Sequence, residues 1–175
     1  IKETGVKETV YTYGEYMRRF VRECKAAGAH PVLFSLTPRD AWKDGKIVRV
    51  DKTFGLWAKQ VAEAENVPFV DLNDISARKF EQYGPEKERY HFYLDHIHSS
   101  RFGAMMNARS AAEGIAMSSD PRLASLQEMM KPLTLPTVSV KRENGKPVVF
   151  ITGDSTVKNE DRDENSMWGW GSQAY

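Results

Sequence analysis

Short, mostly apolar runs alternate with segments of helical periodicity through the first two thirds of this chain. Apolar residues recur at helical spacing over residues 13–27, 51–65 and 74–83, and the runs lie at 32–36 and 67–72. Such runs between helices are typical of strands that are buried on both faces. Because parallel strands need a crossover connection, the alternation predicts an α/β fold with a parallel sheet.

Two further segments complete the expected order of elements. Residues 39–50 are predicted to be a loop, in which Asp44-Gly45 supplies turn chemistry. A late helix is expected where Ser99 or Ser100 can act as its N-cap. Its predicted apolar face consists of Phe102, Met105, Met106, Ala112 and Ile115. A short final helix is expected in SSDPRLASLQEMM.

The composition changes after residue 132. The stretch KPLTLPTVSVKRENGKP holds three of the eight prolines and an Asn-Gly pair. It is typical of a linker, or of an extended arm with one edge strand at 137–140. A third buried strand is predicted at 148–152, where Val-Val-Phe-Ile-Thr precedes Gly-Asp-Ser. We therefore divide the chain at residues 133–146.

Composition limits the classes of function. A length of 175 residues with 41% hydrophobic residues is enough for one domain with a sizeable core. A net charge of +1 gives no indication of a nucleic-acid partner or of an anionic membrane surface. The single cysteine excludes an internal disulfide framework. The chain starts without Met and ends on WGWGSQAY, so we expect a fragment of a longer protein.

The first candidate for chemistry is Ser155. It follows the predicted strand at 148–152, and open α/β sheets bind their ligands at the carboxyl ends of strands. A strand-to-helix turn can expose a serine hydroxyl and direct backbone amides at an oxyanion. The alternative is a plain turn in which Asp154 or Ser155 caps a helix.

The second candidate is the sequence LDHIHSSRFGA. Asp95 and His98 are three residues apart, so the carboxylate can reach the imidazole within one turn. A general-base histidine needs such an orienting carboxylate. The alternative is a surface turn in which Asp95 and Ser99 only cap a helix.

Two other interpretations are less favoured. His91, Asp95, His96 and His98 lie within eight residues, but there are no cysteine ligands and no second ligand cluster in the sequence. Trp168 and Trp170 can stack on a sugar ring, or they can form a buried pair.

Taken together, these segments resemble the SGNH, or GDSL, hydrolases in the subgroup of rhamnogalacturonan acetylesterases. GDSTVKN followed by WGWG resembles the first sequence block of that family, and DHIHSSRFGAMMNA resembles its last block. The run YTYGEYMRRFVRECKAAGAHPVLFSLTPRDAW is similar to the segment that leads to a central strand. The resemblance covers most of residues 5–132 and 147–175.

The resemblance implies a fold and three catalytic roles. The fold is a three-layer α/β domain with a five-stranded parallel sheet flanked by helices, seen here incomplete. Ser155 would be the nucleophile and, through its amide, an oxyanion donor; His98 would be the general base, and Asp95 would orient His98. The glycine and asparagine of the two middle blocks, which complete the oxyanion hole in the family, have no counterpart in this sequence.

The order of the blocks is inverted, since the last block precedes the first. In one arrangement, residues 1–132 are the C-terminal part of one hydrolase domain and 147–175 begin a tandem second copy. In the other, a single domain is permuted and Ser155 meets Asp95 and His98 in one site. Self-association of the chain is a further source of the missing strands.

By this resemblance the chain is predicted to be a serine esterase that removes O-acetyl groups from a plant cell-wall polysaccharide, pectic rhamnogalacturonan in particular. No metal or organic cofactor is implied, no membrane partner is expected, and a secreted or periplasmic location follows from the polymeric substrate. Arg39 and Trp42, after the strand at 32–36, are candidate substrate-binding residues. The alternatives are a non-catalytic carbohydrate-binding or scaffold fragment, and a lipase or thioesterase of the same fold.

Overall fold

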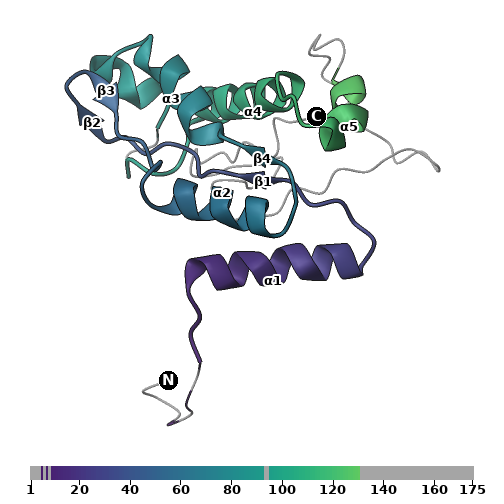
Figure 1. Cartoon of the computed structure of the whole chain (residues 1–175). Coiled ribbons are helices and arrows are strands. Elements are labelled where there is room, and N and C mark those ends of the chain that lie inside the picture. Colours follow the sequence, from purple (N-terminus) through teal and green to yellow (C-terminus); the bar gives the residue numbers. More distant parts are fainter. Residues whose placement is uncertain (1–4, 6, 8, 93–94, 131–175) are drawn as a thin grey trace.

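The structure is a computed structural model that describes residues 5, 7, 9–92 and 95–130 (Figure 1). The predicted linker, the strand at 148–152 and Ser155 lie outside the described residues. In chain order the elements are α1 (Tyr13–Ala26), β1 (Leu33–Phe34), β2 (Trp42–Lys43), β3 (Lys46–Ile47), α2 (Phe54–Ala64), β4 (Phe69–Val70), α3 (Leu72–Glu81), the 3₁₀ segment Pro85–Tyr90, α4 (Arg101–Ala116), the 3₁₀ turn Pro121–Leu123 and α5 (Ala124–Met129).

The centre of the fold is the parallel pair β1 and β4, connected through α2. Leu33 pairs with Phe69, and Phe34 pairs with Val70. This is the parallel arrangement predicted from the alternating pattern, although the paired segments are shorter than the apolar runs. The described residues contain two of the five parallel strands that the family resemblance implies.

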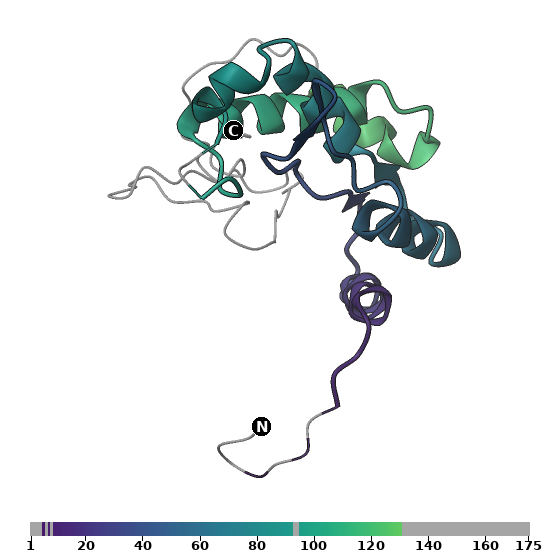
Figure 2. The same cartoon turned by 90° about the vertical axis from the view of Figure 1, so that its left-hand side faces the viewer.

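Helices cover both faces of this strand pair. Leu33 and Phe69 pack with Val21 of α1 and Val61 of α2. Phe34, which follows Leu33, faces the opposite side and packs against α4. Successive side chains of a strand point to opposite faces, so one two-residue strand contributes to two cores. The result is a three-layer arrangement, with α1 and α2 below the strands and α3 and α4 above them (Figures 1 and 2).

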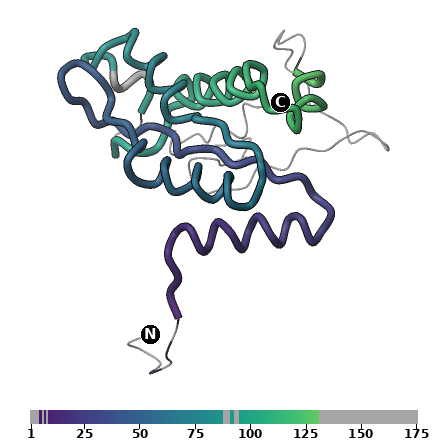
Figure 3. Tube along the Cα trace, in the orientation of Figure 1, coloured from purple at the N-terminus to yellow at the C-terminus, as the bar shows by residue number. Residues whose placement is uncertain are grey.

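The segment at 39–50 is a small hairpin, where the sequence predicted a loop. Trp42 of β2 pairs with Ile47 of β3 in antiparallel register. Asp44 and Gly45 both have positive φ, at 51° and 73°, as a tight two-residue hairpin turn requires. The sequence therefore indicates the turn at Asp44-Gly45, but it does not indicate that the residues on either side pair as β2 and β3. The tube trace shows this hairpin at the end of the molecule beside α3 (Figure 3).

Helix α4 begins as predicted, and its buried face matches the predicted one in part, since Met106 and Ile115 are buried. Ser100 is the N-cap, and its hydroxyl accepts a hydrogen bond from the amide of Gly103 at 3.1 Å. Phe102, expected on the buried face, is 38% exposed. The buried positions are mainly small residues, among them Gly103, Ala104, Ala108 and Ala111. Small side chains let the helix backbone approach the strands closely, so large residues marked only part of the packed face.

Candidate active site

A polar network joins the carboxyl ends of the two parallel strands, with Ser35 and Asn73 buried and Asp71 exposed. Ser35 follows β1, and its hydroxyl donates to Oδ1 of Asp71, which follows β4, at 2.7 Å. The same hydroxyl accepts from the amide of Asn73 at 2.8 Å. Asp71 also caps α3 by accepting from the amide of Asp74. This edge of the sheet, where α/β proteins place their sites, is thus fixed by hydrogen bonds.

Asp95 and His98 are in direct contact, as the spacing suggested. Oδ2 of Asp95 is hydrogen-bonded to Nδ1 of His98. Oδ1 of Asp95 accepts from the amides of Ile97 at 3.0 Å and His98 at 2.9 Å. His96, between them, has a φ of 61°, a left-handed conformation that histidine adopts more readily than most residues. One carboxylate therefore holds both the backbone of this turn and the imidazole.

The charge of Asp95 determines which ring nitrogen of a neutral His98 carries the hydrogen. Hydrogen bonds from the ring and the amide of His98 lower the pKa of Asp95 to about 2, from an ordinary value of 3.8. An ionised carboxylate can only accept, so Nδ1 of a neutral His98 carries the hydrogen. The lone pair is then on Nε2, which is the atom that a histidine base uses to take a proton. The His98 side chain is 24% exposed, so it is partly shielded and still reachable from solvent.

The turn that holds the pair is docked on the segment after β1. The amide of Asp40 donates to the carbonyl of His96 at 3.0 Å. Oδ2 of Asp40 lies 2.6 Å from Nδ1 of His96. Because Asp40 follows β1 by a few residues, these contacts place the Asp95–His98 turn at the carboxyl side of the strands.

The other predicted site residues have different surroundings. Arg39 is exposed. Trp42 is partly buried against a cluster that includes Ile47 and Phe80, and its Nε1 donates to Oδ1 of Asp40 at 2.8 Å. In the structure Trp42 therefore packs in a core, and a role in binding substrate stays a prediction for both residues. Arg39 and Trp42 were predicted as site residues from the sequence, whereas Asp40, which lies between them in the chain, was not.

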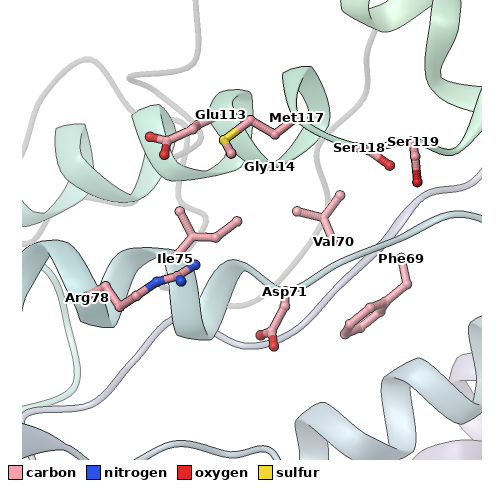
Figure 4. Close-up of a pocket in the computed structure, with 10 residues that line it drawn as sticks. All are labelled: Phe69, Val70, Asp71, Ile75, Arg78, Glu113, Gly114, Met117, Ser118 and Ser119. Carbon is pink, nitrogen blue, oxygen red and sulfur yellow. The ribbon is translucent and has the colours of Figure 1, made fainter.

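A pocket of about 350 Å³ lies between β4, α3 and the end of α4 (Figure 4). Its lining includes Asp71, Arg78 and Glu113 among apolar side chains such as Ile75 and Met117. None of the predicted site residues within the described ranges lines it. We therefore identify the candidate site by the contact between Asp95 and His98, and not by the position of this pocket.

The described part of the chain offers no evidence for a metal centre or a membrane-spanning helix. No group of three or more His, Cys, Asp or Glu side chains there is arranged to hold a metal ion. No helix in the same ranges has the length and apolar character needed to cross a bilayer.

Comparison with known proteins gives relatives of one kind. No protein-family model matches the chain. It is 29% identical over 113 residues to the probable rhamnogalacturonan acetylesterase YesY of Bacillus subtilis, covering 62% of this chain and 52% of that protein. It is 26% identical to the rhamnogalacturonan acetylesterase of Emericella nidulans, covering 65% of this chain and 46% of that enzyme.

A solved structure agrees with the sequence relatives. The crystal structure of the YxiM protein of Bacillus subtilis matches 58% of this chain and 30% of its own, with a TM-score of 0.53 and 30% identity. By sequence, YxiM is called an uncharacterised esterase. The chain spans about half the length of the rhamnogalacturonan acetylesterases that it matches. These similarities confirm the resemblance found in the sequence: the chain is related to SGNH-type esterases, among them the rhamnogalacturonan acetylesterases.

Proposed function

We propose that this chain carries the base half of a serine esterase site, with His98 as the general base and Asp95 as the residue that orients it. The observation that carries the proposal is the double contact of Asp95 with the ring and the backbone of His98. The place of this turn beside the carboxyl side of a parallel strand pair, and relatives named acetylesterase, support it.

The proposed reaction uses Ser155 as nucleophile. Nε2 of His98 takes the hydroxyl proton while Oγ of Ser155 bonds to the ester carbonyl carbon. Collapse of the tetrahedral intermediate breaks the bond to the sugar oxygen, which receives the proton from His98 and leaves as an alcohol. His98 then deprotonates a water molecule, whose oxygen attacks the carbonyl carbon of the acetyl-serine. The bond from that carbon to Oγ of Ser155 breaks, Oγ receives the proton back from His98, and acetate leaves. The amide of Ser155 contributes to the oxyanion hole in this scheme.

The substrate class rests on the relatives. Two of them are named rhamnogalacturonan acetylesterases, so the proposed substrate is an acetylated pectic polysaccharide. Secretion or a periplasmic location is proposed with it, because a cell-wall polymer lies outside the cell. Completion of the sheet to five strands is proposed as well, with the added strands supplied by a tandem copy, by permutation within one domain or by self-association.

The first experiment measures hydrolysis of p-nitrophenyl acetate by the 175-residue chain and by His98→Ala, Asp95→Asn and Ser155→Ala. His30→Ala, which changes an exposed histidine after α1, is the matched control. We expect all three site variants to lose activity that the control keeps. Activity that survives His98→Ala would overturn the proposed role of the base.

A second measurement separates the two chain arrangements. A fluorophosphonate forms a bond from phosphorus to the activated serine oxygen and expels fluoride, and mass spectrometry locates the adduct. Labelling of Ser155 that is lost in His98→Ala means that both residues share a site, as in a permuted domain or an exchanged dimer. Labelling of Ser155 only in the full-length protein means that its base lies elsewhere, as in a tandem. If saccharides bind and no serine is labelled in either protein, the chain is a binding fragment and not an esterase.

A further inference from the structure

We propose that Asp40 is a positioning residue for the base, which holds the Asp95–His98 turn in place through His96. This inference rests on the proposed function, since it assigns Asp40 a role only where His98 acts as the base. Asp40 acts through another side chain and is not itself assigned contact with substrate.

The turn is fixed at its base by backbone contacts. Phe92 and Ser99 form an antiparallel bridge, and the amide of Ser100 donates to the carbonyl of His91 at 2.9 Å. These contacts hold the two ends of the segment together where it meets α4. They do not restrain the part of the turn that carries the Asp95 carboxylate, whose side chain is 41% exposed.

Asp40 supplies the second attachment, at the exposed part of the turn. Its backbone amide and its carboxylate both bind His96, at 3.0 Å and 2.6 Å. His96 is the residue with positive φ, so its conformation sets the direction in which the chain continues toward His98. A residue held in this region costs free energy and persists where its surroundings fix it. The two contacts of Asp40 provide that fixation.

Asp40 is itself immobilised. Its side chain is only 2% exposed, while the His96 side chain that it holds is 62% exposed. Its other carboxylate oxygen accepts from Nε1 of Trp42, whose ring packs in the core beside Ile47. A buried carboxylate with two directed donors has one favoured orientation. The β2–β3 hairpin is thereby connected to the Asp95–His98 turn through Trp42, Asp40 and His96.

The test uses Asp40→Asn, which keeps the size of the side chain and an oxygen for Trp42. Its amide nitrogen cannot accept the hydrogen bond that Oδ2 receives from His96. Asp44→Asn is the matched control, since it makes the same change at the hairpin turn, where asparagine tolerates a positive φ. His96→Asn is the second variant, because it keeps a residue suited to the left-handed region and removes the imidazole. Circular dichroism and thermal melting establish that each variant is folded.

Two readouts decide the outcome. In Asp40→Asn and His96→Asn we expect kcat for p-nitrophenyl acetate to fall about tenfold or more with little change in KM, because a misplaced base lowers the rate without removing substrate contacts. Carbon-13 NMR titration of the Asp95 carboxyl should show its pKa rising from about 2 toward 3.8 as the contact with His98 loosens. The titration does not depend on activity, so it also applies if the 175-residue chain lacks a complete site.

The failures are distinguishable. If His98→Ala abolishes activity while both variants keep the kcat and the Asp95 titration of the unmodified chain, the role of Asp40 is wrong and the proposed function stands. If His98→Ala keeps its activity, the proposed function is wrong whatever Asp40 does. A loss of kcat in Asp40→Asn with an unmoved Asp95 titration would also contradict positioning, because the pair would then still be in place.

Discussion

The carboxylate of Asp95 binds His98 twice, with Oδ1 accepting from the backbone amide at 2.9 Å and Oδ2 bonded to the ring Nδ1. The amide contact fixes where the residue lies, and the ring contact fixes which way the imidazole faces. A helix-capping aspartate would need only backbone contacts of the first kind. The second contact is the one that a general-base histidine needs, so it supports the proposed role over a plain surface turn.

Asp95→Asn should lower kcat by at least about a hundredfold, because an amide favours the wrong imidazole tautomer; in serine proteases the equivalent change costs about 10⁴. The tautomer can be observed separately, by nitrogen-15 NMR of the His98 ring. Asp51→Asn, an exposed aspartate before α2, is the control and should change neither quantity. A His98 ring that keeps its hydrogen on Nδ1 in Asp95→Asn would contradict the orienting role.

The same pair predicts an acid-dependent part of the stability. Since the pKa of Asp95 is lowered to about 2 in the folded state, from an ordinary 3.8, the folded state binds a proton to this group less readily than the unfolded state. The stabilisation is then fully present above pH 3.8 and is lost as the pH falls toward about 2. Urea unfolding at a series of pH values should show the advantage of the unmodified chain over Asp95→Asn shrinking through that range. A difference in unfolding free energy between the two proteins that stays constant with pH would mean that the Asp95–His98 contact does not make stability depend on pH.

Local signals in the sequence located most elements. The helix predicted at 13–27 is observed at Tyr13–Ala26, and the serine cap of α4 is Ser100. The prediction was inaccurate where tertiary packing determines which residues are buried or paired. The face of α4 follows the close approach of Gly114 to Val70, where a Cβ would come within 2.4 Å of a methyl group, and hydrophobicity does not report that constraint. The apolar runs at 32–36 and 67–72 are longer than the paired segments β1 and β4. Each of these two strands has one partner strand among the described residues.

The candidate site was predictable to the extent that it is local. Asp95 and His98 are three residues apart, so their contact follows from the geometry of a turn. Asp40 and His96 are 56 positions apart, and no periodicity or motif connects them. Their contact depends on how the segment after β1 meets the turn before α4, which is a property of the folded chain. Whether Ser155 joins them is likewise a question of topology, so its role stays a prediction.

Burial of His91 should make stability depend on pH in a second, higher pH range. The residue is completely buried, and its ring lies 4.4 Å from that of Phe80 and 4.8 Å from that of Tyr83, measured between centroids. Its ring nitrogens have no hydrogen-bond partner among the described residues. Burial lowers the pKa of His91 from its ordinary value of 6.5, and the charge of Asp40 opposes this shift.

The unfolded chain therefore takes up a proton at this position more readily than the folded chain, and stability should fall as the pH drops below 6.5. In His91→Phe, which keeps an aromatic ring beside Phe80, that decline between pH 6.5 and 5 should be weaker. Thermal melting over this range measures it. His30→Ala, at an exposed position, should keep the decline of the unmodified chain; equal declines in all three proteins would show that His91 does not cause it.

Helix α4 packs closely against the segment that leads into the Asp95–His98 turn. A Cβ on Gly103 would lie 1.9 Å from the carbonyl oxygen of His91, far inside contact distance, and the neighbour is backbone that cannot rotate away. Gly103→Ala should thus destabilise the fold by about 1–3 kcal/mol, as overpacking of a core does. Gly14→Ala in α1 is the matched control, since the nearest atom to its Cβ is 3.5 Å away, and alanine in a helix is favoured over glycine by about 1 kcal/mol.

Urea unfolding of the two alanine variants should therefore give changes of opposite sign. Because Gly103 lies against His91 and is three residues from the Ser100 cap, its substitution should also disturb the backbone bond from Ser100 to His91. Hydrogen exchange at the amide of Ser100 should become faster in Gly103→Ala and stay unchanged in Gly14→Ala. If Gly103→Ala is as stable as the unmodified chain, α4 does not approach the His91 backbone as closely as described, and the base of the Asp95–His98 turn is held by other contacts.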